Sequence, residues 1–243
     1  MSGRRPGSGS GTGADPGKGT GIRELLRDAD WWIRDYAYAV VWQLRAIVDR
    51  TDPDSFHDGE RAPIVVIPGV YETWRFLQPL ITALHERGHP VHVIGPLRWN
   101  NRPVPDAARH VSDYLDEHDL TGVVLVAHSK GGLVGKYSMT LGSAAARVQS
   151  MLAVATPFGG SSYARYMVVP SLRIFRPGDS TLVALSEQHD VNTRIVSVYG
   201  RFDPHIPGGS SLPGAKNVQL DTGGHFRILA HPRVLAELAA LAG

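Results

Sequence analysis

The stretch Val123-Val-Leu-Val-Ala-His-Ser-Lys-Gly-Gly132 joins an apolar run to a glycine-rich break, after which a helical pattern begins. A continuous apolar run of this length predicts a strand that is covered on both faces. Ser129 then falls at a sharp strand-to-helix turn, beside the free backbone N–H groups of a helix N-terminus. That geometry suits a nucleophile whose attack creates an oxyanion. The stretch therefore predicts a nucleophilic serine at the end of a buried strand.

The segments around this turn alternate between strand and helix patterns. Strands are expected at residues 64–67, 91–94, 123–126, 151–154, 195–199 and 217–220. Helical patterns fall around residues 74–84, 106–118, 133–141 and 233–241. This order predicts an α/β fold, in which a doubly wound, mostly parallel sheet carries helices on both faces. We assign residues 61–243 to this domain.

The first residues have a different composition. Residues 1–21 are mostly Gly, Ser, Thr and Pro, and such a segment cannot offset its ordering entropy, so we expect a disordered tail. The tail holds three basic residues and one acidic residue, a net charge of +2, which equals the formal net charge of the whole chain. Because the remainder is near neutral, the sequence pI of about 9.0 does not indicate nucleic-acid binding.

Residues 22–50 contain neither Pro nor Gly and predict one long aromatic helix, followed by a linker to residue 60. An aliphatic stripe follows helical spacing: Leu26, Ile33, Ala37, Val40, Leu44 and Ile47. Trp31, Tyr38 and Trp42 lie off this stripe, so the helix is apolar over more than one face. The helix could pack on the domain under a loop, dock on a membrane surface or self-associate. Its charged residues argue against a membrane-spanning role.

Several classes of site are disfavoured by composition. The chain has no cysteine, which excludes disulfides and thiolate metal sites. No signal-peptide pattern or uncharged run of membrane-spanning length is present, so a cytoplasmic location is expected. The run His85-Glu-Arg-Gly-His89 matches the H-E-x-x-H pattern of zinc proteases, but Gly88 and Pro90 would end the helix before His89. We therefore expect neither a metal nor an organic cofactor.

Three side chains that can act together as nucleophile, base and carboxylate each follow a predicted strand. Ser129, Asp203 and His225 are each placed at the carboxyl end of a strand, where functional groups gather in such sheets. A serine needs a base to accept its proton, and the base needs a carboxylate to fix its tautomer. Asp221 is an alternative to Asp203, and His205 and His231 are alternatives to His225.

The oxyanion also needs hydrogen-bond donors. The backbone N–H of Lys130 follows the nucleophile, and that of Val70 follows a glycine that permits close approach. The Lys130 side chain is expected to point to solvent. Residues 157–192 form a connection that is either a crossover helix with its loop or a cap over an apolar acyl pocket.

These motifs together resemble those of the α/β-hydrolase superfamily, and of small bacterial lipases and esterases within it. The resemblance covers about residue 62 to the C-terminus and rests on Pro68-Gly69, Ala127-His128-Ser129-Lys130-Gly131, Asp203-Pro-His-Ile-Pro207 and Gly224-His225. Ala127 replaces the first glycine of the G-x-S-x-G pattern.

The resemblance implies an acyl-enzyme on Ser129, with His225 as base and then acid and Asp203 as the orienting carboxylate. It implies hydrolysis of a small-molecule or lipid ester that has an apolar acyl group. A thioesterase or acyltransferase would use the same triad. A function from a different class is a non-catalytic protein that binds a membrane or a partner through the N-terminal helix.

Overall fold

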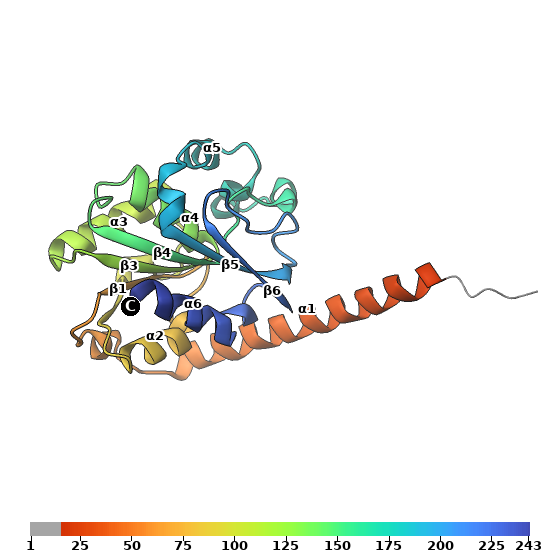
Figure 1. Cartoon of the computed structure of the whole chain (residues 1–243), viewed down its shortest axis with the longest axis horizontal. Coiled ribbons are helices and arrows are strands. Elements are labelled where there is room, and N and C mark those ends of the chain that lie inside the picture. The colour runs from red at the N-terminus through yellow and green to blue at the C-terminus, as the bar shows by residue number, and fades with distance from the viewer. Residues whose placement is uncertain (1–15) are drawn as a thin grey trace, which may run out of the picture.

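One parallel sheet organises the molecule. The computed structural model describes residues 16–243, and its six strands lie in the order β2-β1-β3-β4-β5-β6, all parallel to their neighbours (Figure 1). The strands are β1 Ile64–Ile67, β2 Val91–Val93, β3 Val123–His128, β4 Val148–Val154, β5 Ile195–Phe202 and β6 Lys216–Gly223. The predicted strands are thus all present, and those from β3 onward are longer than expected.

The helices are α1 Pro16–Val48, α2 Gln78–His85, α3 Val104–Glu117, α4 Lys130–Thr140, α5 Ser180–Ser186 and α6 Pro232–Ala242. A helix lies at each position where the sequence predicted one, although residues 74–77 form a 3-10 helix, and α5 lies in the connection that was expected to be a crossover helix or a cap. The tail expected over residues 1–21 lies mostly outside the described residues. Helix α1 starts at Pro16, six residues before the start at Ile22 that the sequence predicted.

Two apolar cores lie on opposite faces of the sheet, because successive side chains of a strand point to opposite sides. In β1, Val65 and Ile67 join the core formed with α3, α4 and α5, whereas Ile64 and Val66 join the core formed with α2 and α6. All four of these β1 side chains are fully buried. This two-sided covering is the doubly wound α/β architecture that the sequence predicted.

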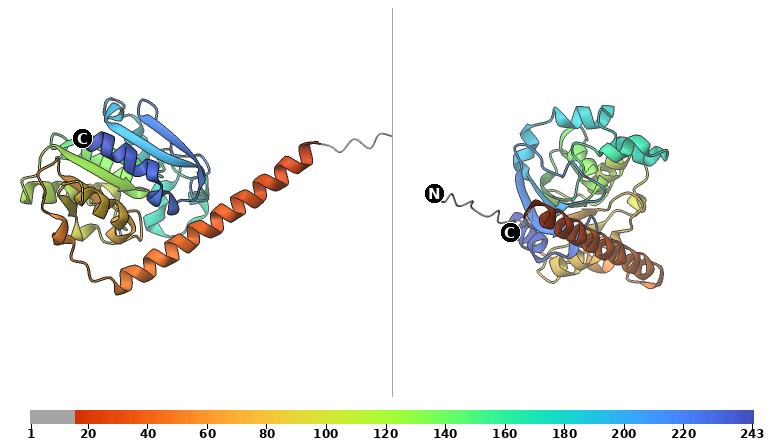
Figure 2. Two further views of the ribbon diagram at one scale, coloured as in Figure 1. Left: turned by 60° about the horizontal axis from the view of Figure 1, so that its bottom comes forward. Right: turned by 90° about the vertical axis from the view of Figure 1, so that its right-hand side faces the viewer.

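Helix α1 packs against the domain through its aromatic face. Trp31 stacks on Phe202 of β5, and Trp42 packs on the core that contains α2 and α6. The aliphatic stripe instead faces solvent, which corrects the expectation that a loop would cover a second face of this helix. The N-terminal turns of α1 also extend beyond the body of the molecule (Figures 1 and 2).

The H-E-x-x-H run from His85 to His89 does not bring its two histidines together. Helix α2 ends at His85, whose Nε2 lies 2.6 Å from Asp58 Oδ1, while His89 Nδ1 lies 3.0 Å from the carbonyl oxygen of Ala62. The two imidazoles therefore have different partners on different segments, as the helix-ending residues predicted. No helix among residues 16–243 combines the length and the apolarity needed to cross a bilayer.

The connection after β4 is more than a simple crossover helix. It contains two short 3-10 helices, Ser162–Tyr166 and Pro170–Phe175, before the brief helix α5. The 3-10 helices lie beside the carboxyl ends of the strands, where they cover one side of the candidate site. We call residues 157–178 the cap segment.

Candidate active site

Ser129 occupies a strained turn between β3 and α4. Its φ is +52° and its ψ is −122°, a backbone conformation that ordinary residues rarely adopt. Its N–H donates to the carbonyl of Val154 at 2.9 Å, which fixes the turn to β4. Gly131 allows α4 to approach β1, because a Cβ there would overlap the carbonyl oxygen of Ile67. The side chain of Ser129 is thereby held at the edge of the sheet.

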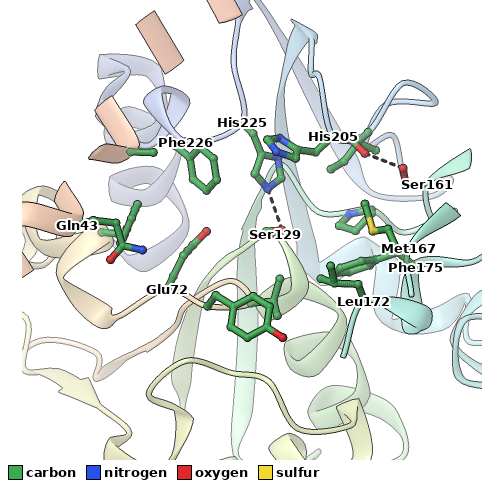
Figure 3. A pocket seen from close by; sticks show the side chains of 16 residues that line it. Gln43, Glu72, Ser129, Ser161, Met167, Leu172, Phe175, His205, His225 and Phe226 are labelled. Atoms are coloured by element: carbon green, nitrogen blue, oxygen red, sulfur yellow. Dashed lines mark hydrogen bonds between the residues drawn. The ribbon is translucent and has the colours of Figure 1, made fainter. Parts of the chain in front are cut away.

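The three residues that the sequence predicted for the triad meet at this edge. Ser129 Oγ lies 2.9 Å from Nε2 of His225, and the two side chains point toward each other (Figure 3). His225 Nδ1 donates to Oδ2 of Asp203 at 2.8 Å. All three residues are buried. In the neutral imidazole this arrangement leaves Nε2 free to accept the serine proton.

The charges around His225 favour its protonated form. Burial alone would lower the pKa of the imidazole, but the carboxylate of Asp203 and its hydrogen bond outweigh that effect and raise the pKa above its ordinary value. Burial would likewise raise the pKa of Asp203, yet His225 and the N–H of His205 hold it below the usual range. The site therefore stabilises an imidazolium next to a carboxylate.

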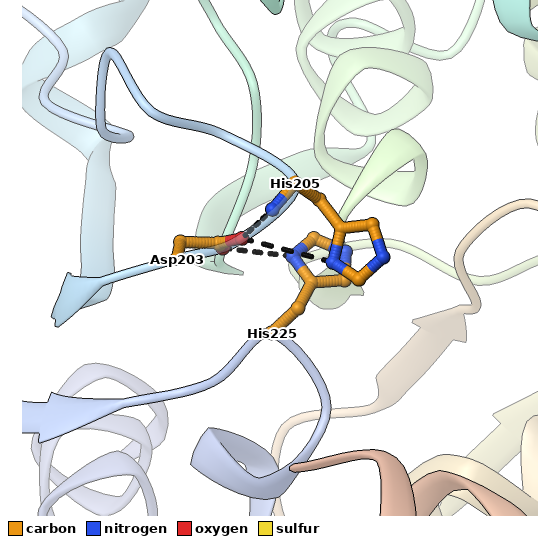
Figure 4. Close-up of side chains that lie close together, drawn as sticks. All are labelled: Asp203, His205 and His225. Carbon is orange, nitrogen blue, oxygen red and sulfur yellow. Dashed lines mark hydrogen bonds and ion pairs between the residues drawn. The ribbon is translucent and has the colours of Figure 1, made fainter. Parts of the chain in front are cut away.

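The alternatives considered from the sequence lie elsewhere or serve other purposes. Asp221 is exposed on β6, 3.2 Å from Arg201. His231 caps α6 by accepting a hydrogen bond from the N–H of Arg233. His205 is the only one of the three at the site, with its ring centroid 4.7 Å from that of His225 (Figure 4).

His205 is held neutral. Burial and the charge of His225 lower the pKa of His205 to about 4. Its Nε2 lies 3.1 Å from the hydroxyl of Tyr36 on α1, so the ring stands between α1 and the predicted base. Ligand atoms of Asp203, His205 and His225 all lie within 4.8 Å of one another and could in principle hold a metal ion. The hydrogen bond between Asp203 and His225, however, already uses Oδ2 of Asp203 and Nδ1 of His225.

Both predicted oxyanion donors border the serine. Lys130 is the first residue of α4, so its backbone N–H has no partner within the helix. Val70 lines the same cavity as Ser129. Its neighbours in the loop are fixed, since the N–H of Gly69 donates to Glu72 at 2.8 Å and that of Tyr71 to the carbonyl of Trp99 at 2.6 Å.

The side chain of Lys130 does not point to solvent as expected. It is buried, and its ammonium donates to the carbonyl oxygens of Asn100 (2.7 Å) and Arg102. Asn100 in turn donates from its side-chain amide to the carbonyl of Pro68 at 2.7 Å. Burial lowers the pKa of Lys130 to about 8. The residue after the nucleophile therefore anchors the loop that supports the oxyanion segment.

A second buried pair, Glu72 and His128, lies behind the serine. Glu72 Oε2 is 2.8 Å from His128 Nδ1, and His128 Nε2 is 2.9 Å from the carbonyl oxygen of His225. A carbonyl can only accept, so Nε2 carries a proton. Although burial opposes ionisation of Glu72, His128 keeps the pKa of this carboxyl below its usual value. The Glu72–His128 pair thus joins three segments of the site: the loop after β1, the end of β3 and the loop of His225.

Helix α1 supplies a third buried carboxylate. Asp35 is fully buried, and it accepts hydrogen bonds from the backbone N–H groups of His225 (2.8 Å), Phe226 (2.7 Å) and Arg227 (2.8 Å). Gly224 has a φ of +112°, and a Cβ there would lie 2.5 Å from Asp35 Oδ1. The glycine pair before His225 therefore also makes room for α1. This role of Asp35 was not predicted from the sequence, because nothing local to Asp35 indicates a partner 190 residues away.

The cavity next to Ser129 has a volume of about 290 Å³. Its wall is mainly apolar and is contributed by the cap segment, α1 and the loops around the strand ends: Ala39, Val70, Phe76, Pro157, Met167, Leu172, Phe175, Ile206 and Phe226. Met167, Leu172 and Phe175 lie on one side of the serine, and Gln43 and Phe226 lie on the other (Figure 3). The arrangement can hold an apolar group against the hydroxyl of Ser129.

Comparisons with known proteins identify the architecture. No family model matches the sequence, and no curated protein matches it significantly. Among solved structures, a mature lipase of Bacillus licheniformis superposes with a TM-score of 0.62 at 18% identity, over 79% of this chain and 96% of the lipase. The chain has the α/β-hydrolase fold.

Other neighbours with this fold differ in their described activity. Lipase B of Aspergillus fumigatus matches with a TM-score of 0.62 at 14% identity, over 79% of this chain and 55% of that one. An enol-lactonase of Burkholderia xenovorans matches with a TM-score of 0.51 at 15% identity, over 75% and 92% of the two chains. The fold predicted from the sequence is confirmed, and it is shared by enzymes that act on different substrates.

Replacing Asp35 tests whether α1 positions the His225 loop. In Asp35→Asn the amide cannot accept from all three N–H groups without presenting its own NH₂ to one of them. We expect a loss of at least about 2 kcal/mol in the free energy of unfolding, because hydrogen bonds to a charged group are lost in a buried site. We expect the rate at which Ser129 reacts with a fluorophosphonate probe to fall about 10- to 100-fold, as for a small displacement of a reacting group.

The matched control is Asp28→Asn on the same helix, where Asp28 pairs with Arg27 at the partly exposed surface. This variant should keep the stability and activity of the unaltered chain. Equal behaviour of the two variants in urea unfolding and in kinetics would show that Asp35 does not hold the loop.

Proposed function

We propose that this protein is a serine hydrolase that cleaves carboxylic esters through an acyl-enzyme on Ser129. The observation that carries the proposal is the continuous path of hydrogen bonds from Ser129 Oγ to His225 and on to Asp203, beside an apolar cavity. The path supplies the nucleophile, the base and the orienting carboxylate that acyl transfer requires. The cavity supplies a place for an apolar acyl chain.

In the first half of the proposed reaction, His225 Nε2 accepts the proton of Ser129 as Oγ attacks the ester carbonyl carbon. The carbonyl oxygen becomes an oxyanion, which the backbone N–H groups of Val70 and Lys130 would stabilise. The imidazolium then gives its proton to the leaving alkoxide, and the carbon–oxygen bond of the ester breaks. The products of this half are a free alcohol and the acylated Ser129.

In the second half, water takes the place of the alcohol. His225 accepts a proton from the water as its oxygen attacks the acyl-enzyme, and it then returns the proton to Ser129 Oγ. The carboxylic acid leaves and the site is restored. The Glu72–His128 pair would keep the His225 carbonyl and the oxyanion loop in place through both halves, and it neither gives nor takes a proton in these steps.

Substitution of the triad residues tests the chemistry. We expect Ser129→Ala to lower kcat by about 10⁶-fold and to abolish labelling by a fluorophosphonate probe, because a triad without its nucleophile retains only background catalysis. Asp203→Asn should cost about 10⁴-fold through the wrong histidine tautomer. Asp221→Asn is the control and should be indistinguishable from the unaltered chain. If Ser129→Ala retains a tenth of the normal turnover, Ser129 is not the nucleophile.

The pH dependence follows from the raised pKa of His225. Attack requires the neutral imidazole, so kcat/KM should increase with pH and level off above the pKa of His225, with a midpoint above the ordinary histidine value of 6.5. In Asp203→Asn the stabilising charge is gone, so the midpoint of the residual activity should move to lower pH. If the midpoint is unchanged in this variant, Asp203 does not interact with the group whose titration controls kcat/KM.

The size of the cavity limits the acyl group. The volume of about 290 Å³ is at the lower end of the usual range for ligand pockets, so we expect an acyl chain of intermediate length to fit best. With nitrophenyl esters of increasing length, kcat/KM should rise from acetyl to about octanoyl or decanoyl and then fall.

Met167→Ala enlarges the cavity wall, so it should shift this optimum toward longer chains. Val169→Ala, in the same segment but outside the wall, is the matched control and should not shift it. Thioesters of the same acyl groups, and alcohols offered as acceptors, would distinguish ester hydrolysis from thioester hydrolysis and acyl transfer.

A further inference from the structure

A second cavity lies on the α4 side of the sheet, next to the start of the cap segment. Its volume is about 460 Å³, which is within the usual range for a small-molecule pocket. Pro157 lines the cavity at Ser129, whereas the next two residues, Phe158 and Gly159, line this one. The three residues of the candidate triad do not border it. The second cavity is therefore separate from the candidate active site.

Lys136 of α4 brings a buried cation to the wall of this cavity, which we call the Lys136 cavity. The residue is 1% exposed, as buried as Lys130. The Lys130 ammonium donates to two carbonyl oxygens, but no group among residues 16–243 accepts a hydrogen bond from the Lys136 ammonium or forms an ion pair with it. Burial alone lowers the pKa of Lys136 to about 8. Because a buried charge is costly without a partner, an anion in this cavity meets a charge that the chain leaves uncompensated.

The rest of the wall decides which kind of anion fits. Phe158, Leu185, Leu212 and Pro213 make most of it apolar. Such a wall suits a hydrocarbon group, whereas an inorganic ion would lose its hydration there without new hydrogen bonds. Glu187 borders the cavity at its exposed edge, where its carboxylate would repel a second negative charge on the ligand. The wall therefore fits a ligand that has one carboxylate and an apolar body.

Asn192 is a second residue of the wall with an unpaired polar atom. Its Nδ2 donates to the carbonyl oxygen of Pro213 at 2.8 Å, and its Oδ1 is buried without a donor. An amide oxygen is neutral, so it does not replace the missing anion. We propose that the Lys136 cavity binds an amphipathic carboxylate, whose headgroup pairs with Lys136 and whose apolar part lies against Phe158 and Leu212. The proposed ester hydrolysis releases such a carboxylate, but the binding site does not rest on that function.

Titration calorimetry of the full chain with octanoate tests the proposal. We expect Lys136→Met to weaken octanoate binding about 10- to 100-fold, because the ligand loses a charge-assisted hydrogen bond in a buried site. Octanamide, which has the same length and no charge, should bind the variant and the unaltered chain alike. Lys216→Met is the matched control, because Lys216 is exposed and its partner Glu237 keeps its pairing with Arg233. Equal octanoate affinity in Lys136→Met and the unaltered chain would overturn the proposal.

Two further measurements distinguish other ligands and the other cavity. Inorganic phosphate should not compete with octanoate; if it competes at equal concentration, the cavity binds simple anions and the proposal is wrong. Met167→Ala changes the cavity at Ser129 and should leave octanoate affinity unchanged. If Met167→Ala weakens octanoate binding and Lys136→Met does not, the ligand occupies the cavity at Ser129 instead. These measurements need no turnover, so a chain that hydrolyses no ester could still confirm the Lys136 site.

The pH dependence of octanoate binding tests the same charge in the unaltered chain. Octanoate pairs with protonated Lys136, so its affinity should be constant up to about pH 8 and should then fall about tenfold per pH unit as the free ammonium loses its proton. Glu187 and His189 are the other titratable residues that line the cavity, and both are exposed. Glu187→Gln and His189→Gln should leave this decline in place, and Lys136→Met should remove it. An affinity that stays constant as the pH rises through 8 would contradict the pairing with Lys136.

Discussion

Three buried carboxylates hold the loops at the carboxyl edge of the sheet. Asp203 bonds His225, Glu72 bonds His128 and the N–H of Gly69, and Asp35 collects three N–H groups of the His225 loop. A buried charge is costly unless it is paired and hydrogen-bonded. Each carboxylate therefore fixes the position of the groups that satisfy it, and together they define where Ser129 and His225 meet.

Because Asp35 holds the His225 loop, α1 is a part of the candidate active site. Asp35 holds the loop of His225, Tyr36 contacts His205, and Ala39 and Gln43 line the cavity. The same helix presents its aliphatic stripe on the opposite side. One face of this helix thus supports the candidate active site, and the opposite, aliphatic face is exposed.

Much of the fold could be predicted from the sequence, because strands and helices have patterns of apolar residues that are local in the chain. Continuous apolar runs such as residues 64–67 predict strands buried on both faces, and the order of strands and helices along the chain then favours a parallel sheet. Ser129, Asp203 and His225 could be selected because each follows a strand, and carboxyl ends of parallel strands meet at one edge. The choice of Asp203 over Asp221 was left open by the sequence, since both lie near the right strands.

The sequence by itself determined the strand order along the chain, the turn at Ser129 and the residue types that could act there. Only the tertiary structure decided which face of α1 packs, where the Lys130 ammonium lies and that Asp35 contacts the His225 loop. The physical reason is that helical periodicity reports that a face is apolar but not what covers it. The aromatic face of α1 packs on β5 and on the α2–α6 core, whereas its aliphatic stripe is exposed. Contacts between residues 190 positions apart depend on the folded chain, and no local pattern encodes them.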